Sequence, residues 1–301
     1  MEGSVTARSA DHATPHVAGA FACFGERWQI ACDDPALARF LGELYAPMLN
    51  DSRGGDPVVT YRLTTASGGG SGEVHRDDEL LVRSPRPSRL LGKLVWAINR
   101  QVIDASGARL LLHAAAAADP HGRSVLLPAP MESGKTTLVT GLLDRGLAYL
   151  TDEAVVVEPD LSVHGFRKPL SIDKGSWGVL GHHRPVLATG LSAYLDDQWQ
   201  VAPHRFASVA PRGVLAAIVF PAYRAGQATA LERLHPVSAL DLARASAFGE
   251  PGRPLPAEKM AQLAHVVTSV PCFSLRFSDL SEACSEVLEV LGQGGRGTDH
   301  G

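Results

Sequence analysis

The chain has 301 residues, of which 45% are hydrophobic and 20% are charged, and its formal net charge is −4. This length predicts one large domain, or two with one of them small, and the ordinary composition excludes wholesale disorder and fibrous repeats. A mildly acidic chain has no general attraction for nucleic acid, and no apolar run approaches the about 18 residues of a membrane helix. We therefore expect no nucleic-acid or membrane partner.

The N-terminal segment and the cysteines bear on the compartment. The first twenty residues include Glu2 and Asp11 and lack the basic-then-apolar order of a signal peptide. The four cysteines form no C-x-x-C pair, so we expect small buried side chains in a reducing compartment. These features predict a cytoplasmic protein.

The first third of the chain, residues 1–105, predicts a small α+β domain. Apolar residues recur at helical spacing in two segments, and shorter runs are typical of strands. A glycine- and serine-rich stretch at 67–72 favours a hairpin connection over an interdomain linker. In chain order we expect a strand at 27–32, a helix at 35–48, strands at 58–64 and 79–82, and a helix at 90–103.

Residues 106–292 predict an α/β domain, and residues 293–301 a flexible tail. Strands and helices alternate here, which favours a sheet with helices layered against it. Apolar runs at 109–118 and 124–127 are typical of strands buried on both faces. The other expected elements are a helix at 134–145, strand segments at 147–150, 154–157, 163–172 and 214–223, helices at 236–248 and 257–269, a strand at 272–277 and a helix at 279–291.

The segment 126–138 ends in a motif typical of phosphate-binding loops. Gly134, Lys135 and Thr136 stand between an apolar strand and an amphipathic helix. Such loops direct backbone N–H groups and a helix N-terminus at phosphate oxygens. The lysine would reach the β- and γ-phosphates, and the threonine hydroxyl would ligate Mg²⁺. The residues expected to contact ATP, or another nucleoside triphosphate, are Pro130, Met131, Glu132, Ser133, Gly134, Lys135, Thr136 and Thr137.

Two positions depart from the usual loop pattern. Ala129 stands where the pattern has glycine, and alanine cannot adopt a positive φ cheaply. Glu132 adds an anion where phosphates would lie, so its side chain should point outward or meet the nucleotide through the metal or a base. An ordinary helix N-terminus with a surface lysine is the alternative interpretation.

An acid pair, Asp152 and Glu153, follows the next strand. The twelve-residue helix before it spans about 18 Å, and the returning strand at 147–151 spans about 16 Å. These lengths bring the acids back to the level of Lys135 and Thr136, on the strand expected to neighbour the loop strand. One carboxylate could join the magnesium shell while the other accepts a proton from an attacking hydroxyl. A strand end with solvated acids is the alternative.

His113 ends the apolar strand that precedes the loop strand. If the two strands are antiparallel or adjacent, its imidazole could lie near the phosphates. We therefore count His113 with Lys135, Asp152 and Glu153 as candidate catalytic residues, the alternative being a structural histidine.

Together these residues resemble the HPr kinase/phosphorylase family, and particularly its kinase-like relatives in bacterial peptide-modification gene clusters. The resemblance covers about 110–172, from the histidine-bearing strand through the loop to the acid pair. It implies a P-loop core with a mixed sheet flanked by helices. Ala129 and Glu132 replace two of the family's glycines, Met131 replaces its serine, and the acid pair is Asp-Glu instead of Asp-Asp.

The resemblance also implies roles for individual residues. Asp152 would be the base that faces the acceptor hydroxyl, and Glu153 would lie nearer the metal, although the sequence leaves this order open. Thr136 and an acid of the pair would hold Mg²⁺. Arg167 and Lys168, in the basic segment after the pair, would balance charge on the phosphates, with Arg205 and Arg224 as weaker candidates.

Other motifs in the sequence give weaker indications of function. The pairs His182-His183 and His12-x-x-x-His16 lack the partners of a zinc site. Residues 173–212 show little periodicity and could form a lid, an acceptor-binding insertion or a structural loop. No G-x-S-x-G elbow supports a serine hydrolase.

The leading function is an ATP-dependent kinase whose acceptor is a hydroxyl, serine-like in character, on a peptide, small protein or small metabolite. The family's later loop for phosphorolysis has no counterpart, which favours a kinase over a bifunctional enzyme. The alternatives are an ATP-binding regulatory or assembly protein without phosphotransfer, and a non-catalytic interaction module with a vestigial loop. A homo-oligomer is compatible with each of these functions.

Overall fold

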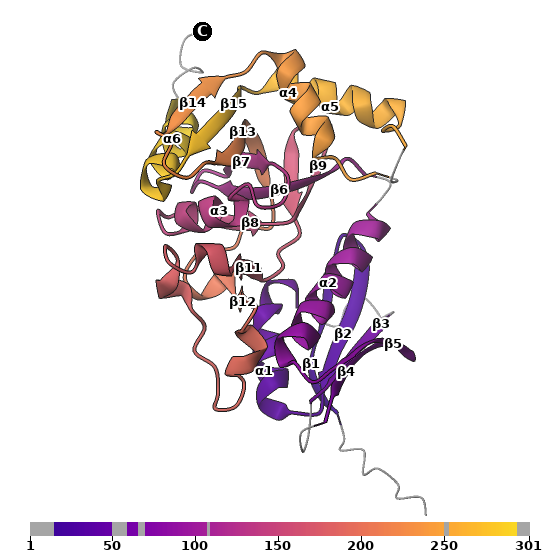
Figure 1. Ribbon diagram of the computed structural model, residues 1–301. Helices are drawn as coiled ribbons and strands as arrows, with labels where there is room; N and C mark the ends of the chain where they lie inside the picture. The colour runs from indigo at the N-terminus through magenta and orange to yellow at the C-terminus, as the bar shows by residue number, and fades with distance from the viewer. Residues whose placement is uncertain (1–14, 50–58, 66–69, 107–108, 250–252, 294–301) are drawn as a thin grey trace, which may run out of the picture.

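A computed structural model describes residues 15–49, 59–65, 70–106, 109–249 and 253–293 (Figure 1). Within these ranges the chain is a mixed α/β protein with six α-helices and three β-sheets. The tail expected at 293–301 lies outside the described residues apart from Gln293, and residues 67–69 of the expected hairpin connection at 67–72 lie outside them too. None of the helices within these ranges is long and apolar enough to span a membrane.

The first sheet is five-stranded, and its strands lie side by side in chain order. The second and third strands are parallel, and the other neighbours are antiparallel. Helices α1 (Pro35–Leu44) and α2 (Pro87–Ala105) belong to this part of the chain. The strands are β1 (His16–Cys23), β2 (Glu26–Cys32), β3 (Val59–Thr64), β4 (Gly72–Arg76) and β5 (Glu79–Ser84).

The two helices of this part differ in length from the sequence-based expectation. Helix α1 begins where the Asp34 carboxylate accepts hydrogen bonds from the backbone N–H groups of Ala36 and Leu37, at 2.8 and 2.7 Å, as N-capping residues do. It ends at Leu44 and not at residue 48, because Pro47 lacks an N–H and cannot continue a helix. Helix α2 starts three residues earlier than expected, because Pro87 suits the first helical position.

The second sheet has eight strands and mixed direction. Its order is β10-β9-β6-β7-β13-β15-β14, with β8 also pairing with β6. Strand β13 runs parallel to β7 and β15, whereas β6 runs antiparallel to β7, β8 and β9. The strands are β6 (Leu111–Ala118), β7 (Arg123–Pro128), β8 (Ala148–Thr151), β9 (Ala154–Val157), β10 (Ser162–Gly165), β13 (Gly213–Tyr223), β14 (Ala230–Arg233) and β15 (Cys272–Phe277).

Helices cover both faces of this sheet, as Figure 1 shows. Helices α3 (Lys135–Leu143) and α6 (Leu280–Gln293) lie on one face, and α4 (Pro236–Ala245) and α5 (Ala257–Ser269) lie on the other. The two buried clusters follow this division, since the alternating side chains of β6 enter one cluster or the other. The layered α/β arrangement expected for this part is therefore present.

The run of alanines in β6 lets α3 lie close to the sheet. Ala115 and Ala117 are fully buried in the same cluster as Leu138 and Leu142 of α3. Because alanine has only a methyl group, the helix can approach this strand closely. The start of α3 is thereby held over the middle of the sheet, with β6 between the loop strand and the strand that carries the acid pair.

The third sheet is a two-stranded ribbon of β11 (Leu170–Asp173) and β12 (Gln198–Val201). The expectation of a single strand segment at 163–172 is wrong, because the chain leaves the large sheet after Gly165 and pairs again only from Leu170. Part of the irregular segment 173–212 is ordered by the stacked rings of Trp177 and Trp199, whose centroids lie 4.7 Å apart. In Figure 1 the ribbon lies between the two larger sheets.

Candidate phosphate-transfer site

The predicted phosphate loop connects the end of β7 at Pro128 to the start of α3 at Lys135. Gly134 is the residue before the helix and has φ +90°. A Cβ there would lie 2.9 Å from Cζ of Phe277 and 3.3 Å from Cβ of Tyr223. Both the backbone conformation and the close packing therefore require glycine at this position.

The two departures from the loop pattern have different structural outcomes. Ala129 is not among the residues with positive φ, so the conformation that alanine disfavours does not arise there. Glu132 does have a positive φ, +62°, which is uncommon for a residue with a side chain. Its side chain is exposed, as is that of Met131, which is 82% accessible.

The loop and the first turn of α3 present donors that the fold leaves available. A hydrogen bond of 2.8 Å runs from Leu138 N–H to the Gly134 carbonyl, and the amides ahead of it in the first turn have no intrahelical acceptor. The buried Ser133 hydroxyl has no hydrogen-bond partner among the described residues. Such a set of donors suits a phosphate or another anion.

Lys135 is folded back onto the loop. Its Nζ donates to the carbonyl oxygens of Ala129 and Pro130, each at 2.7 Å, and the residue is only 6% exposed. Burial lowers the pKa of Lys135 to about 8, although the nearby carboxylates of Glu153 and Asp152 act in the opposite direction. The ammonium group is therefore poorly solvated where it stands, which favours binding of an added anion.

Asp152 meets the start of α3. Its Oδ2 lies 3.4 Å from Thr136 Oγ1 and accepts the Ser171 N–H at 3.2 Å. Its Oδ1 lies 2.7 Å from Lys168 Nζ and accepts the Tyr149 hydroxyl at 3.0 Å. The predicted level of this acid is thus confirmed, but the predicted adjacency is wrong: β8 pairs with β6, and β6 separates it from the loop strand.

Glu153 and His113 form a second pair beside the first. His113 lies in β6, antiparallel to the loop strand, and its Nδ1 is 3.0 Å from the Glu153 carbonyl and 3.6 Å from Oε1. Its Nε2 is buried without a hydrogen-bond partner among the described residues. Burial, with the charge of Lys135, lowers the pKa of His113, although the nearby carboxylates of Glu153 and Asp152 act in the opposite direction.

In the basic segment after the acid pair, Lys168 forms an ion pair with Asp152 and is not free to bind a phosphate. Lys168 is fully buried, and besides Asp152 its Nζ donates to the Pro169 carbonyl at 2.9 Å and to Ser171 Oγ at 3.1 Å. Three acceptors occupy its three donors. Arg167 beside it is partly buried.

The two weaker arginine candidates lie elsewhere. Arg205 pairs with Glu43 of α1, so its guanidinium is directed to the N-terminal part of the chain. Arg224 donates to the Tyr223 carbonyl at 3.2 Å, at the end of β13. Thr137, predicted to contact the nucleotide, has its hydroxyl 2.5 Å from Ser176 Oγ.

Sequence reasoning missed the residues that hold Asp152 in place. The Tyr149 hydroxyl donates to Asp152 and also contacts the Lys168 carbonyl at 2.9 Å. Ser171 Oγ bonds to Gln200 Oε1 at 3.1 Å, which extends the network into β12. The signal available in the sequence was the tyrosine of the short segment Ala148–Thr151 and the two glutamines of the segment Gln198–Val201.

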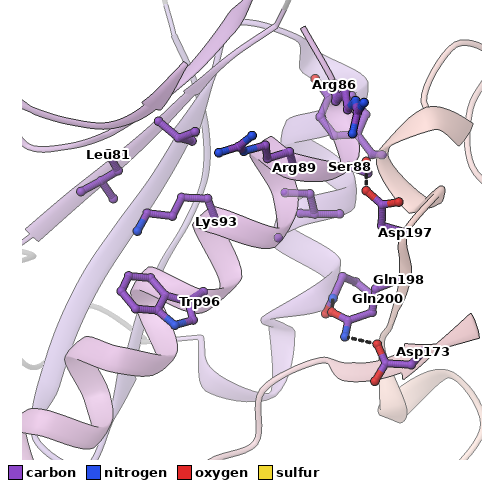
Figure 2. Close-up of a pocket in the computed structure, with 14 residues that line it drawn as sticks. Leu81, Arg86, Ser88, Arg89, Lys93, Trp96, Asp173, Asp197, Gln198 and Gln200 are labelled. Atoms are coloured by element: carbon purple, nitrogen blue, oxygen red, sulfur yellow. Dashed lines mark hydrogen bonds between the residues drawn. The ribbon is translucent and has the colours of Figure 1, made fainter. Parts of the chain in front are cut away.

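The same network reaches a cavity of about 650 Å³ between α2 and the two-stranded ribbon. Gln200 contacts Gln198 at 2.6 Å, and Gln198 contacts Asp173 at 2.8 Å. Figure 2 shows these ribbon residues facing side chains from α2. The basic residues in the lining are Arg89 and Lys93 of α2 and Arg86, which directly precedes the helix.

The donor set beside the loop fits a magnesium ion. Thr136 supplies a hydroxyl oxygen and Asp152 a carboxylate oxygen, both of them hard ligands of the kind that Mg²⁺ prefers. Oδ2 of Asp152 accepts only a backbone N–H and the distant threonine hydroxyl, which leaves lone-pair capacity on that oxygen.

Comparisons with known proteins give little. No protein-family model and no curated protein matches the chain. Among solved structures, the HPr(Ser) kinase/phosphatase from Coxiella burnetii is similar over 62% of this chain and 95% of its own, at 14% identity and a TM-score of 0.29. A similarity of that size carries no argument about the chain, so the functional case rests on the site itself.

Proposed function

We propose that the chain is an ATP-dependent phosphotransferase that delivers the γ-phosphoryl group to a hydroxyl on a peptide, small protein or small metabolite. The observation that carries the proposal is the 3.4 Å approach of Thr136 Oγ1 to Asp152 Oδ2, beside a loop that ends in a buried lysine. A hydroxyl, a carboxylate and an ammonium group at one helix N-terminus are the parts that phosphoryl transfer requires.

Each part has a distinct role in this proposal. When Mg·ATP is bound, ATP would supply the phosphoryl group, and the magnesium ion would offset the negative charge of the phosphates. The loop amides and Lys135 would bind the phosphate oxygens, with Nζ exchanging the carbonyls of Ala129 and Pro130 for them. Thr136 and Asp152 would hold the metal, and Tyr149 and Lys168 would keep the aspartate oriented.

For the acid pair, the contacts favour the opposite order to the one that the resemblance implies. The Asp152 side chain is 2% exposed and already bound by several donors, one of them Lys168. The Glu153 side chain is 29% exposed and therefore open to an acceptor. We assign Asp152 to the metal and Glu153, with His113 beside it, to the acceptor proton. A positioned base of this kind typically contributes about 10²–10⁴-fold in rate.

The test is ATP binding by calorimetry together with γ-phosphoryl transfer from labelled ATP to a panel of serine and threonine peptides, and to water. Lys135→Ala is expected to abolish binding of Mg·ATP. Glu153→Gln should keep binding within about threefold and lose at least about 10²-fold in transfer, whereas Asp152→Asn should weaken binding only when Mg²⁺ is present. Glu258→Gln, in the exposed face of α5, is the matched control. Wild-type protein that binds no ATP would contradict the proposal.

A second function is favoured by one observation. Glu132 places a carboxylate on the phosphate loop in a conformation that usually belongs to glycine, and this charge opposes phosphate binding. An ATP-binding regulatory or assembly protein without phosphotransfer would tolerate that cost. ATP binding without transfer to any acceptor or to water, in wild-type and Glu132→Gly protein alike, would favour this second function.

A further inference from the structure

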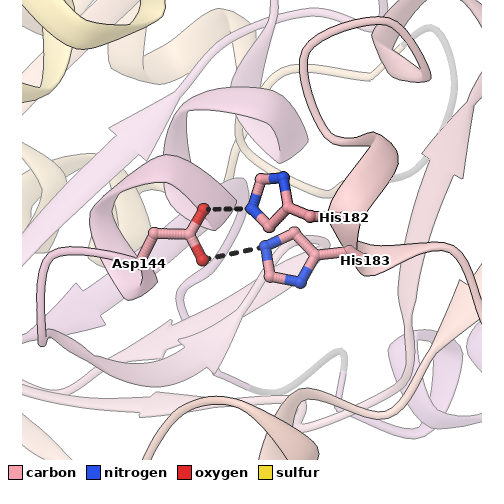
Figure 3. A group of neighbouring side chains, drawn as sticks. All are labelled: Asp144, His182 and His183. Atoms are coloured by element: carbon pink, nitrogen blue, oxygen red, sulfur yellow. Dashed lines mark hydrogen bonds and ion pairs between the residues drawn. The ribbon is translucent and has the colours of Figure 1, made fainter.

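A group of three metal-ligating side chains lies at the opposite end of α3 from the phosphate loop (Figure 3). Asp144 directly follows the last residue of α3, and His182 and His183 lie in the short 3₁₀ turn Gly181–His183. The carboxylate is 3.1 Å from His182 Nε2 through Oδ2 and 2.8 Å from His183 Nε2 through Oδ1.

We propose that Asp144, His182 and His183 bind one zinc ion. This site is separate from the phosphate-transfer site and does not depend on the proposed function. The sequence shows the histidine pair without partners, and the fold supplies the third ligand from 38 residues away.

The donor atoms have the chemistry and spacing of a zinc site. Two imidazole nitrogens and one carboxylate oxygen are a common ligand set for zinc, which leaves the fourth tetrahedral position to water. The three atoms lie within 4.8 Å of one another. Ligands placed about 2.0–2.1 Å from a tetrahedral zinc are roughly 3.3 Å apart, so small side-chain movements are enough to admit the ion.

The surroundings add to the case. The His183 side chain is 6% exposed, and its ring packs on Phe206 with centroids 4.0 Å apart, which restricts its orientation. The C-terminal end of a helix carries partial negative charge and favours a cation. Arg145, next to Asp144 in the sequence, is directed to the Gly141 carbonyl and Ser281. Arg184, next to His183, is exposed to solvent.

The ion would join the segment at 174–183 to the helix that carries Lys135 and Thr136. That segment already contacts the start of α3 through Thr137 and Ser176. A zinc ion at the other end would fix it along the whole helix. We therefore expect zinc to stabilise the folded chain, because an ion that binds only the folded state raises its stability.

The experiment is calorimetry with Zn²⁺, and absorption spectroscopy with Co²⁺, on the untagged full-length chain after treatment with a chelator. We expect one ion per chain, the visible absorption of four-coordinate Co²⁺, a higher Tm with zinc, and no displacement of Co²⁺ by excess Mg²⁺, which prefers oxygen ligands. His182→Ala and Asp144→Asn should each weaken zinc binding by at least about tenfold and remove the shift in Tm.

Two matched variants keep the test specific. His121→Ala removes an exposed histidine outside the group and should leave zinc binding unchanged. Glu153→Gln should do the same, which excludes the His113–Glu153 pair as the site. Absence of stoichiometric binding, or binding that survives both His182→Ala and Asp144→Asn, would mean that the three side chains form only a hydrogen-bonded cluster and would overturn the proposal.

Discussion

Lys168 Nζ lies 2.7 Å from Asp152 Oδ1, and the two side chains are 0% and 2% exposed. A buried ion pair is costly to form and more costly to break, because removal of one partner leaves the other charge without compensation. The ion pair fixes the position of the Asp152 carboxylate. That position therefore depends on Lys168, which lies 16 residues later in the chain.

Lys168→Met is expected to destabilise the protein by about 3–5 kcal/mol, the usual cost of a broken buried pair. Adding Asp152→Asn to this variant should recover part of the loss, since no uncompensated charge remains. Urea unfolding of the two single variants and the double variant measures both effects. A loss below about 1 kcal/mol for Lys168→Met would contradict the role given to the pair.

Gly134→Ala should damage the phosphate loop. Its φ of +90° disfavours a side chain, and the added Cβ would lie 2.9 Å from the Phe277 ring. We expect a loss of about 1–3 kcal/mol in stability and weaker ATP binding by calorimetry. Gly92→Ala is the control, because this helical glycine of α2 has open space around it and alanine there should stabilise by about 0.5–1 kcal/mol. Equal effects of the two substitutions would refute the argument.

Two substitutions distinguish the effect of the Glu132 charge on nucleotide binding from the effect of its backbone conformation. Glu132→Gln removes the anion alone, and Glu132→Gly also relieves the positive φ of +62°. Both should tighten Mg·ATP binding several-fold at low salt, and the gain should shrink as salt screens the charge. Calorimetry at two ionic strengths checks this. Unchanged affinity in both variants would show that the carboxylate does not oppose the phosphates.

The four thiols should be inert in the native protein. Burial raises the pKa of Cys23 and Cys32 to about 12, and that of Cys272 and Cys284 to about 11. Because the thiolate is the reactive form, Ellman's reagent at pH 8 should react slowly with folded protein and with all four cysteines after unfolding in guanidinium. Rapid reaction of even one thiol in the native state would disprove this.

The sequence predicted elements best where periodicity and proline agreed. The helix at 257–269 and the strand at 272–277 have their expected bounds, because Pro256 and Pro271 flank the helix. Strand β1 and strand β12 were not foreseen. The residues of β1 lack clear alternation, and β12 has only the four residues Gln198–Val201, so pairing with β2 and β11 decides their conformation.

For the candidate site, too, some features could be predicted from the sequence and others could not. The loop and the level of Asp152 followed from the lengths of one helix and one strand, which are local quantities with nearly constant rise per residue. The strand order did not follow, since β6 pairs on both sides and separates β7 from β8. The ion pair between Lys168 and Asp152 could not be predicted from these lengths either.

By itself, then, the sequence determined that a lysine and a threonine open a helix beside a returning acid pair, because motif, periodicity and segment length are properties of contiguous residues. Tertiary structure alone decided which acid faces Thr136 and which faces His113. It also decided that Asp144 meets His182 and His183. These contacts join segments 16 to 40 residues apart, and their geometry depends on how the strands and the ribbon pack.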